Sequence, residues 1–243
     1  MMELIVFIFG LAVGSFLNVL IDRLPRGEDV ITGRSVCDHC KKVLRWYELI
    51  PLLSFFLQRG RCRRCHEKLF WQYPVVELVT AVGFVYLQSQ ALEFPQSLAL
   101  VGWLLFFCSL LVIFVADFKY QIIPDSMVII GIVGVLLQGQ ALWLSALGAG
   151  GFFFLLWLVT RGKGMGLGDV KFAFLMGLLL GFPNIIVASY LAFLTGAVVG
   201  VILILTGKTQ LRAHIAFGPF LVLGTIIALG WGKQLIQWWM NIL

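Results

Sequence analysis

The chain has 243 residues, of which 60% are hydrophobic and only 12% are charged. This composition is too apolar for an ordinary soluble domain and is typical of helices packed in lipid. The net charge of +6 could suggest a nucleic-acid partner, but 11 of the 18 Lys and Arg residues lie between Arg23 and Lys68, beside a hydrophobic segment. Positive charge beside a membrane helix explains this cluster better, so we expect a membrane-lipid environment and no nucleic-acid partner.

Apolar segments long enough, or nearly so, to cross a bilayer recur along the chain. The first has no basic residue before it and no convincing small-residue cleavage site after it, so we expect a retained helix instead of a signal peptide. The fourth and sixth are short for a full span. The sequence therefore predicts an all-α polytopic membrane protein with about eight transmembrane helices. They cover residues 4–21, 71–87, 97–116, 122–137, 141–160, 170–181, 185–205 and 215–231.

The one sizeable hydrophilic stretch, residues 22–70, contains two Cys-x-x-Cys pairs. Cys37 and Cys40 form the first pair, and Cys62 and Cys65 form the second, with 21 residues between the pairs. This is the usual layout of a tetrahedral zinc site with four thiolate ligands. A loop of this length has too little apolar surface to fold alone, and a structural metal would supply a cross-link. We therefore predict a small zinc-binding domain.

Other interpretations of the cysteines remain open. They could form two disulfides, although the predicted topology places them in the reducing cytoplasm. They could also be redox pairs, although no thioredoxin-like strand and helix surround them. His39 and His66 would be bystanders, because four thiols already complete a tetrahedron. Cys108, in the middle of an apolar segment, would be an inert packing residue.

The distribution of basic residues predicts the orientation of the chain in the membrane. The alternate loops around Glu93, Gly139 and Pro183 carry no Lys or Arg. We therefore expect the other set of loops to be cytoplasmic, with the cysteine loop among them and both termini outside. The basic residues of that set are the cluster within 23–68, then Lys119, Arg161, Lys163, Lys208 and Arg212.

The same topology places three aspartates at the cytoplasmic ends of helices. Asp117 follows the third predicted helix, Asp125 opens the fourth and Asp169 precedes the sixth. A carboxylate beside hydrocarbon is costly, so such residues usually have a function. Two carboxyls held close together share a proton, so that one can activate water while the other donates to a peptide carbonyl. The sequence therefore predicts a two-aspartate active site that includes Asp169.

Each acidic residue also has a structural alternative. Asp117 could be a helix-end charge paired with Lys119, and Asp125 could be the N-cap of the helix that it opens. Glu77, inside the second predicted helix, is expected to need a partner such as an arginine. It could be structural, or it could line the site.

Three glycines alternate with other residues directly before Asp169, over residues 164–168. Because glycine has no side chain, Gly166 and Gly168 would let an extended substrate backbone approach closely. The same run could be a flexible hinge between helices. A nucleotide loop is a weaker interpretation, because no Walker lysine or strand-turn-helix context accompanies the glycines.

Taken together, these motifs resemble the type IV prepilin peptidases, membrane aspartyl proteases of the Gly-x-Gly-Asp class. The resemblance covers nearly the whole chain in the order that the family uses. It departs at Ala216, where the family usually has proline, at a position away from the aspartates. The segments that carry it are residues 14–19, the two cysteine pairs, 73–77, Asp117 with 123–125, 166–171 and 217–220.

The resemblance implies that the chain removes the short basic leader of prepilins or pseudopilins at the cytoplasmic face of the bacterial inner membrane. It also implies N-methylation of the new N-terminus with S-adenosylmethionine as donor, although no glycine loop of a soluble methyltransferase is present. The implied domains are a first helix (1–21), a zinc-binding loop (22–70) and a peptidase bundle (71–243). The implied catalytic pair is Asp117 and Asp169, with Asp125, Gly166, Gly168, Lys171 and Glu77 accessory or substrate-binding.

Three other functions stay open on the sequence alone. A peptidase without methylation would cleave its substrate but transfer no methyl group. A non-enzymatic zinc-bearing scaffold would keep its function when Asp117 and Asp169 are changed to asparagine. A transporter would place carboxylates at several depths of the bundle, whereas the three aspartates cluster at one predicted side.

Overall fold

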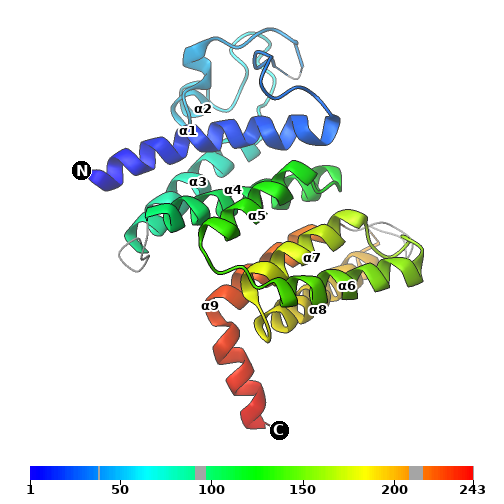
Figure 1. Ribbon diagram of the computed structural model, residues 1–243. Coiled ribbons are helices and arrows are strands. Elements are labelled where there is room, and N and C mark those ends of the chain that lie inside the picture. Colours follow the sequence, from blue (N-terminus) through cyan, green and yellow to red (C-terminus); the bar gives the residue numbers. More distant parts are fainter. Residues whose placement is uncertain (38, 91–96, 208–215, 243) are drawn as a thin grey trace. The chain divides into compact units, whose positions relative to one another are not determined.

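The computed structural model describes residues 1–37, 39–90, 97–207 and 216–242, which are coloured in Figure 1. Glu93, Lys208 and Arg212, on which part of the predicted orientation rests, lie outside these described residues. The chain divides into two compact units, Met1–Val112 and Ile113–Leu243. Regular structure in the described residues is helical, apart from two isolated β-bridges in the N-terminal unit.

The N-terminal unit consists of two packed helices, the hydrophilic loop that joins them, and the first part of α4. Short helical turns interrupt the loop, which is the pale blue region of Figure 1. The elements are α1 (Met2–Arg23), η1 (Leu24–Arg26), η2 (Trp46–Leu49), α2 (Leu53–Leu57), α3 (Gln72–Ser89) and α4 (Ser97–Tyr120), which continues into the second unit.

Small residues bring α1 and α3 into close contact. A Cβ atom added at Gly10 would lie 2.6 Å from the Cα of Ala81, and one added at Gly14 would lie 2.7 Å from the Cα of Glu77. Close packing of this kind, with polar groups bonded across the interface, is how helices associate in lipid. Asn18 supplies such a bond, because its Nδ2 donates to the carbonyl of Tyr73 at 3.1 Å.

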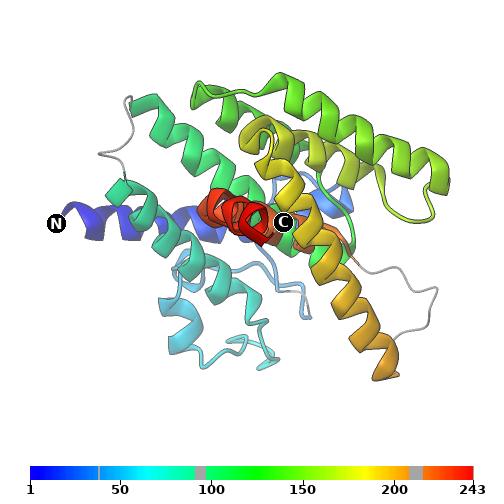
Figure 2. The same cartoon turned by 90° about the horizontal axis from the view of Figure 1, so that it is seen from below.

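The C-terminal unit is arranged around one short, buried helix. This helix, α7, contacts α5, α6, α8 and α9, and most of its side chains are buried. Figure 2 shows α6 and α7 side by side, where Gly177 of α7 lies against the backbone of Ser145 and Ala146. The elements are α5 (Asp125–Leu137), α6 (Trp143–Thr160), α7 (Leu167–Leu180), α8 (Asn184–Leu205) and α9 (Gly218–Ile242).

Helices occur at all eight predicted positions. Five of those in the described residues are long and apolar enough to cross a membrane, namely α1, α4, α6, α8 and α9. The two segments expected to be short are short, with 13 residues in α5 and 14 in α7. The all-helical class and the presence of several helices long and apolar enough to cross a membrane are therefore confirmed, whereas the number eight stays a prediction.

Several predicted boundaries were wrong. The last helix, α9, runs to Ile242 instead of ending at residue 231. Two further errors concern the aspartates. α4 runs to Tyr120 instead of ending at residue 116, so Asp117 lies within its last turn. α7 begins at Leu167 instead of residue 170, so Asp169 lies within its first turn. An acidic side chain is favourable in the first turn of a helix, because the unpaired amides there carry partial positive charge.

Gly10→Ala is expected to lower the stability of the protein, because α1 and α3 must separate to admit a Cβ atom. Overpacking of this kind costs about 1–3 kcal/mol. The control is Gly148→Ala on α6, where nothing lies within 4 Å of an added Cβ. Thermal unfolding of the purified protein in detergent measures both, and equal midpoints for the two variants would contradict the close packing.

Candidate active site and metal centre

The structure brings the two predicted catalytic aspartates together in the C-terminal unit. Asp117, in the last turn of α4, is 5% exposed, and Asp169, in the first turn of α7, is 7% exposed. The charge of Asp117 acts on Asp169, so the two carboxyl groups lie within electrostatic range of each other. Buried carboxyl groups need hydrogen-bond partners, and the nearby backbone provides them.

Each carboxylate accepts a hydrogen bond from the amide of a glycine at a helix N-terminus. The amide of Gly218, the first residue of α9, donates to Oδ2 of Asp117 at 2.8 Å. The amide of Gly166, the N-cap of α7, donates to Oδ2 of Asp169 at 2.9 Å. Amides at helix N-termini have no partner within the helix, so each bond satisfies both groups. Among the described residues, no hydrogen bond engages Oδ1 of either aspartate.

Position 218 requires glycine because there is no space for a side chain beside Asp117. An added Cβ would lie 2.6 Å from Oδ2 of Asp117 and 3.0 Å from its Cγ. Gly168 is also tight, because its added Cβ would lie 3.0 Å from the Cβ of Ile123. Gly166 has more room, with Oδ2 of Asp169 at 3.7 Å as its nearest neighbour. Sequence reasoning missed Gly218, although the run 217–220 was among the motifs of the resemblance.

Asp125 and Lys171 form an ion pair between α5 and α7. The Nζ of Lys171 lies 2.7 Å from both carboxylate oxygens of Asp125. The N-cap of α5 is Pro124, and no side chain caps it, so the N-cap role expected for Asp125 was wrong. Both side chains of the pair are largely exposed, so the pair contributes little to stability.

Glu77 lies in the N-terminal unit, whereas the aspartates lie in the C-terminal one. Its Oε2 accepts a hydrogen bond from the amide of Leu52 at 2.8 Å. A backbone amide therefore takes the place of the expected arginine partner. Through this bond Glu77 connects the hydrophilic loop to the α1–α3 pair.

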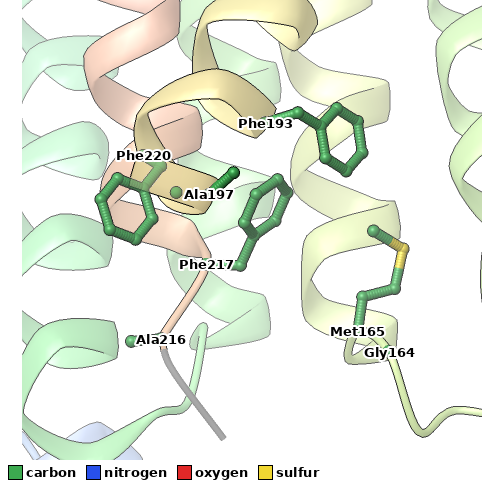
Figure 3. Close-up of a pocket in the computed structure, with 8 residues that line it drawn as sticks. Gly164, Met165, Phe193, Ala197, Ala216, Phe217 and Phe220 are labelled. Atoms are coloured by element: carbon green, nitrogen blue, oxygen red, sulfur yellow. The ribbon is translucent and has the colours of Figure 1, made fainter. Parts of the chain in front are cut away.

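An apolar pocket of about 270 Å³ is lined by residues of the same unit (Figure 3). Two of its lining residues, Gly164 and Met165, directly precede the amide donor Gly166. Two others, Ala216 and Phe217, directly precede the amide donor Gly218. The pocket wall is thus continuous in sequence with both donors. Its lining is completed by Phe193, Gly196, Ala197 and Phe220.

The four loop cysteines form a cluster that fits a metal ion. Their sulfur atoms all lie within 4.8 Å of one another, and the Sγ atoms of Cys37 and Cys65 are 3.9 Å apart. Tetrahedral zinc with Zn–S bonds of ~2.3 Å places its sulfur ligands about 3.8 Å apart. All four thiols are free, so the disulfide alternative is not supported. The cluster itself contains neither His39 nor His66.

The two cysteine pairs are copies of one hydrogen-bonded turn, displaced by 25 residues from Cys37 to Cys62. The amide of Cys37 donates to the carbonyl of Lys42 at 3.0 Å, and the amide of Cys62 donates to that of Glu67 at 2.8 Å. The amides of Cys65 and Arg64 lower the pKa of the Cys62 thiol to about 7, which favours the thiolate form. Sequence reasoning found the pairs but not the repeat. Matching bridges flank them, at Val36–Val43 and Arg61–Lys68.

Comparison with known proteins covers both units. Residues 8–91 match the bacterial peptidase A24 N-terminal domain, and residues 104–201 match the type IV leader peptidase family. A protein of Bacillus subtilis (strain 168) is 33% identical over 98% of each chain. A Legionella pneumophila protein is 32% identical over 99% of this chain and 95% of its own. Both relatives are named prepilin leader peptidase/N-methyltransferase, and no solved structure matches the chain significantly.

Cys62→Ser is expected to abolish metal retention, because it removes one of four thiolates. The wild-type protein, purified without added chelator, should carry about one zinc ion per chain, as measured by inductively coupled plasma mass spectrometry. Cys108→Ser, which changes a cysteine outside the cluster, should retain the metal. Equal metal content in the two variants would remove the cluster as the binding site.

Proposed function

The chain belongs to the type IV leader peptidase family, and from this we propose that it cleaves the leader of prepilins or pseudopilins with Asp117 and Asp169 as the catalytic pair. One observation carries the choice of residues. Two buried carboxyl groups from different helices interact electrostatically, and each is held by a single backbone amide. Their second oxygens are left for water and substrate. The substrate proposed is the short basic leader that precedes the hydrophobic helix of these proteins.

The proposed reaction uses one shared proton. The ionised aspartate takes a proton from water as the water oxygen attacks the scissile carbonyl carbon. The protonated aspartate donates to the carbonyl oxygen, which gives a tetrahedral diol. Collapse of the diol breaks the C–N bond, and the departing amine takes a proton from the pair. The two glycine amides hold the Oδ2 atoms throughout, so that the Oδ1 atoms face the reaction.

We propose accessory roles for the other site residues. Gly166 would let an extended leader lie close to Asp169, because it presents no side chain. Gly168 would be accessory through packing, because Ile123 occupies the space that its side chain would take. Asp125 and Lys171, whose ion pair is largely exposed, would be accessory or substrate-binding residues. Glu77 would act in the N-terminal unit, where it fixes the loop to the helices.

We propose N-methylation of the new N-terminus as a second activity, which the names of the relatives include. S-adenosylmethionine would be the methyl donor, and the only support for it is the resemblance to the family. Zn²⁺ held by Cys37, Cys40, Cys62 and Cys65 would stabilise the domain of residues 22–70, as their clustering supports. The alternative is a peptidase without methylation, which would release a cleaved substrate with a free amine.

The chain contains several apolar helices that are long enough to cross a membrane. We propose eight spans in the bacterial inner membrane, with residues 1–21 forming the first and the bundle extending over 71–243. The zinc loop and both aspartates would be cytoplasmic, and both termini outside. Support comes from helices at all eight predicted positions, five of them of membrane-spanning length, and from the basic residues in alternate loops.

Asp117→Asn and Asp169→Asn are each expected to reduce leader removal by about 10²–10⁴-fold, because asparagine cannot exchange the shared proton. The assay co-expresses the chain with a model prepilin and follows the shortened product. Asp125→Asn, which alters an exposed aspartate of the same unit, serves as the matched control and should lose far less. Cleavage that persists in either of the first two variants, at equal protein level, would remove that residue from the pair and reopen the scaffold function.

Gly218→Ala is expected to slow leader removal by about 10²-fold, because the added Cβ displaces the carboxylate of Asp117. Gly151→Ala on α6, where nothing lies within 4 Å of an added Cβ, is the control. Cleavage of a purified substrate should separate the two variants. Wild-type rates for Gly218→Ala would show that this contact does not position Asp117.

A further inference from the structure

The hydrophilic loop contains a second cavity, which the proposed peptidase reaction does not use. It has a volume of about 710 Å³ and lies beside the second cysteine pair. Three arginines line it together with neutral and polar side chains, and no carboxylate is among the described residues of the lining. The lining consists of Tyr47, Ser54, Leu57, Gln58, Arg59, Arg61, Cys62, Arg63 and His66.

The arginines of this cavity lack a carboxylate partner among the residues that the structure describes. None of Arg59, Arg61 and Arg63 forms an ion pair with a carboxylate of the described residues. Tyr47 organises one side of the cavity, because the guanidinium of Arg63 lies 5.5 Å from the centre of its ring. Arg45 donates to the Tyr47 hydroxyl at 3.0 Å, which holds that ring in place. Arginine residues that line one cavity suit a phosphate, because a guanidinium group can donate paired hydrogen bonds to it.

An exposed apolar face adjoins the cavity. Leu53, Phe56 and Leu57 recur on one face of α2, and each is more than half exposed. The opposite face of α2 is buried through Phe55, whose ring lies 5.1 Å from that of Trp71. Leu57 belongs both to the exposed face and to the cavity lining. The loop therefore presents an anion-binding cavity and an apolar face in direct continuity.

The position of the loop in the chain indicates what would cover this surface. The loop starts at the end of α1, a helix long and apolar enough to cross a membrane, and it returns at α3, so the proposed topology places it at the membrane surface. A molecule with a phosphate and an apolar chain is present there at high concentration, namely a phospholipid. Apolar faces lie at the headgroup boundary, and anionic lipids attract basic segments beside membrane helices.

We propose that the cavity of Arg59, Arg61 and Arg63 binds the phosphate of an anionic phospholipid, with an acyl chain along the exposed face of α2. The arginines could also offset the negative charge of a four-thiolate zinc centre. That role would not require the apolar face of α2, nor a cavity whose described lining residues include no carboxylate. Lipid binding accounts for both features together.

The test uses the full-length zinc-loaded protein in nanodiscs of phosphatidylcholine, with and without phosphatidylglycerol. Hydrogen–deuterium exchange reports protection of residues 53–66 as the anionic lipid is raised. The test variant carries Arg59→Gln, Arg61→Gln and Arg63→Gln. The matched control carries Lys41→Gln, Lys42→Gln and Lys68→Gln, which removes the same charge from the same loop outside the cavity lining. Zinc content checks that both loops stay folded.

Phosphatidylglycerol should protect residues 53–66 in the wild type and in the lysine control. The arginine variant should need about tenfold more of the lipid for the same protection. The pair Phe56→Ser and Leu57→Ser, which leaves the cysteine turns untouched, should also weaken the effect. An equal loss of protection in the arginine and lysine variants would mean that the lipid is attracted by the net charge of the loop. That result would overturn the proposed binding site. Equal protection by soluble glycerol phosphate in phosphatidylcholine discs would overturn the lipid as its ligand.

Discussion

A carboxylate buried in a membrane protein needs a hydrogen-bond donor, and the site of this chain depends on two such donors. In both cases the donor is an amide at the N-terminus of a helix, at Gly166 for α7 and at Gly218 for α9. These amides would otherwise lack a partner, so aspartate and helix end stabilise each other. Asp169 lies in the first turn of α7, and the packing of α7 among four other helices of its unit keeps this turn buried.

The sequence predicted the helices and the cysteine cluster well because both leave a local signal, in apolar runs and in the spacing of paired thiols. It failed where the decisive contact is distant. Gly218 lies 101 residues from Asp117, and nothing in its own neighbourhood indicates that a carboxylate occupies the space of a side chain. The partner of Glu77 is similarly distant, since the amide of Leu52 lies in the loop and any residue type could supply it. The ends of α4 and α7 were misplaced because Asp117 and Asp169 were taken to lie outside the helices. Both residues lie within a terminal helical turn.

The hydrophilic loop solves a different physical problem, which is how to order a segment that has little core of its own. A repeated turn places the two cysteine pairs so that four sulfur atoms converge. Phe55 and Trp71 add a small apolar contact, and Glu77 fixes the loop to the helix pair. These contacts leave one face of α2 and a basic cavity unused by the fold, and those are the parts of the loop available to bind other molecules.

The continuous helix α4 has a consequence for how the chain can be divided. Compact packing changes from one unit to the other between Val112 and Ile113, inside this helix. The two family matches separate earlier, between residues 91 and 104. A fragment cut at the packing boundary would leave Asp117 on a stub of eight helical residues, Ile113–Tyr120, too short to form a stable helix alone. A fragment cut before Ser97 would keep the whole of α4 with both aspartates. The boundary between the two family matches and the boundary between the two compact units therefore fall at different residues.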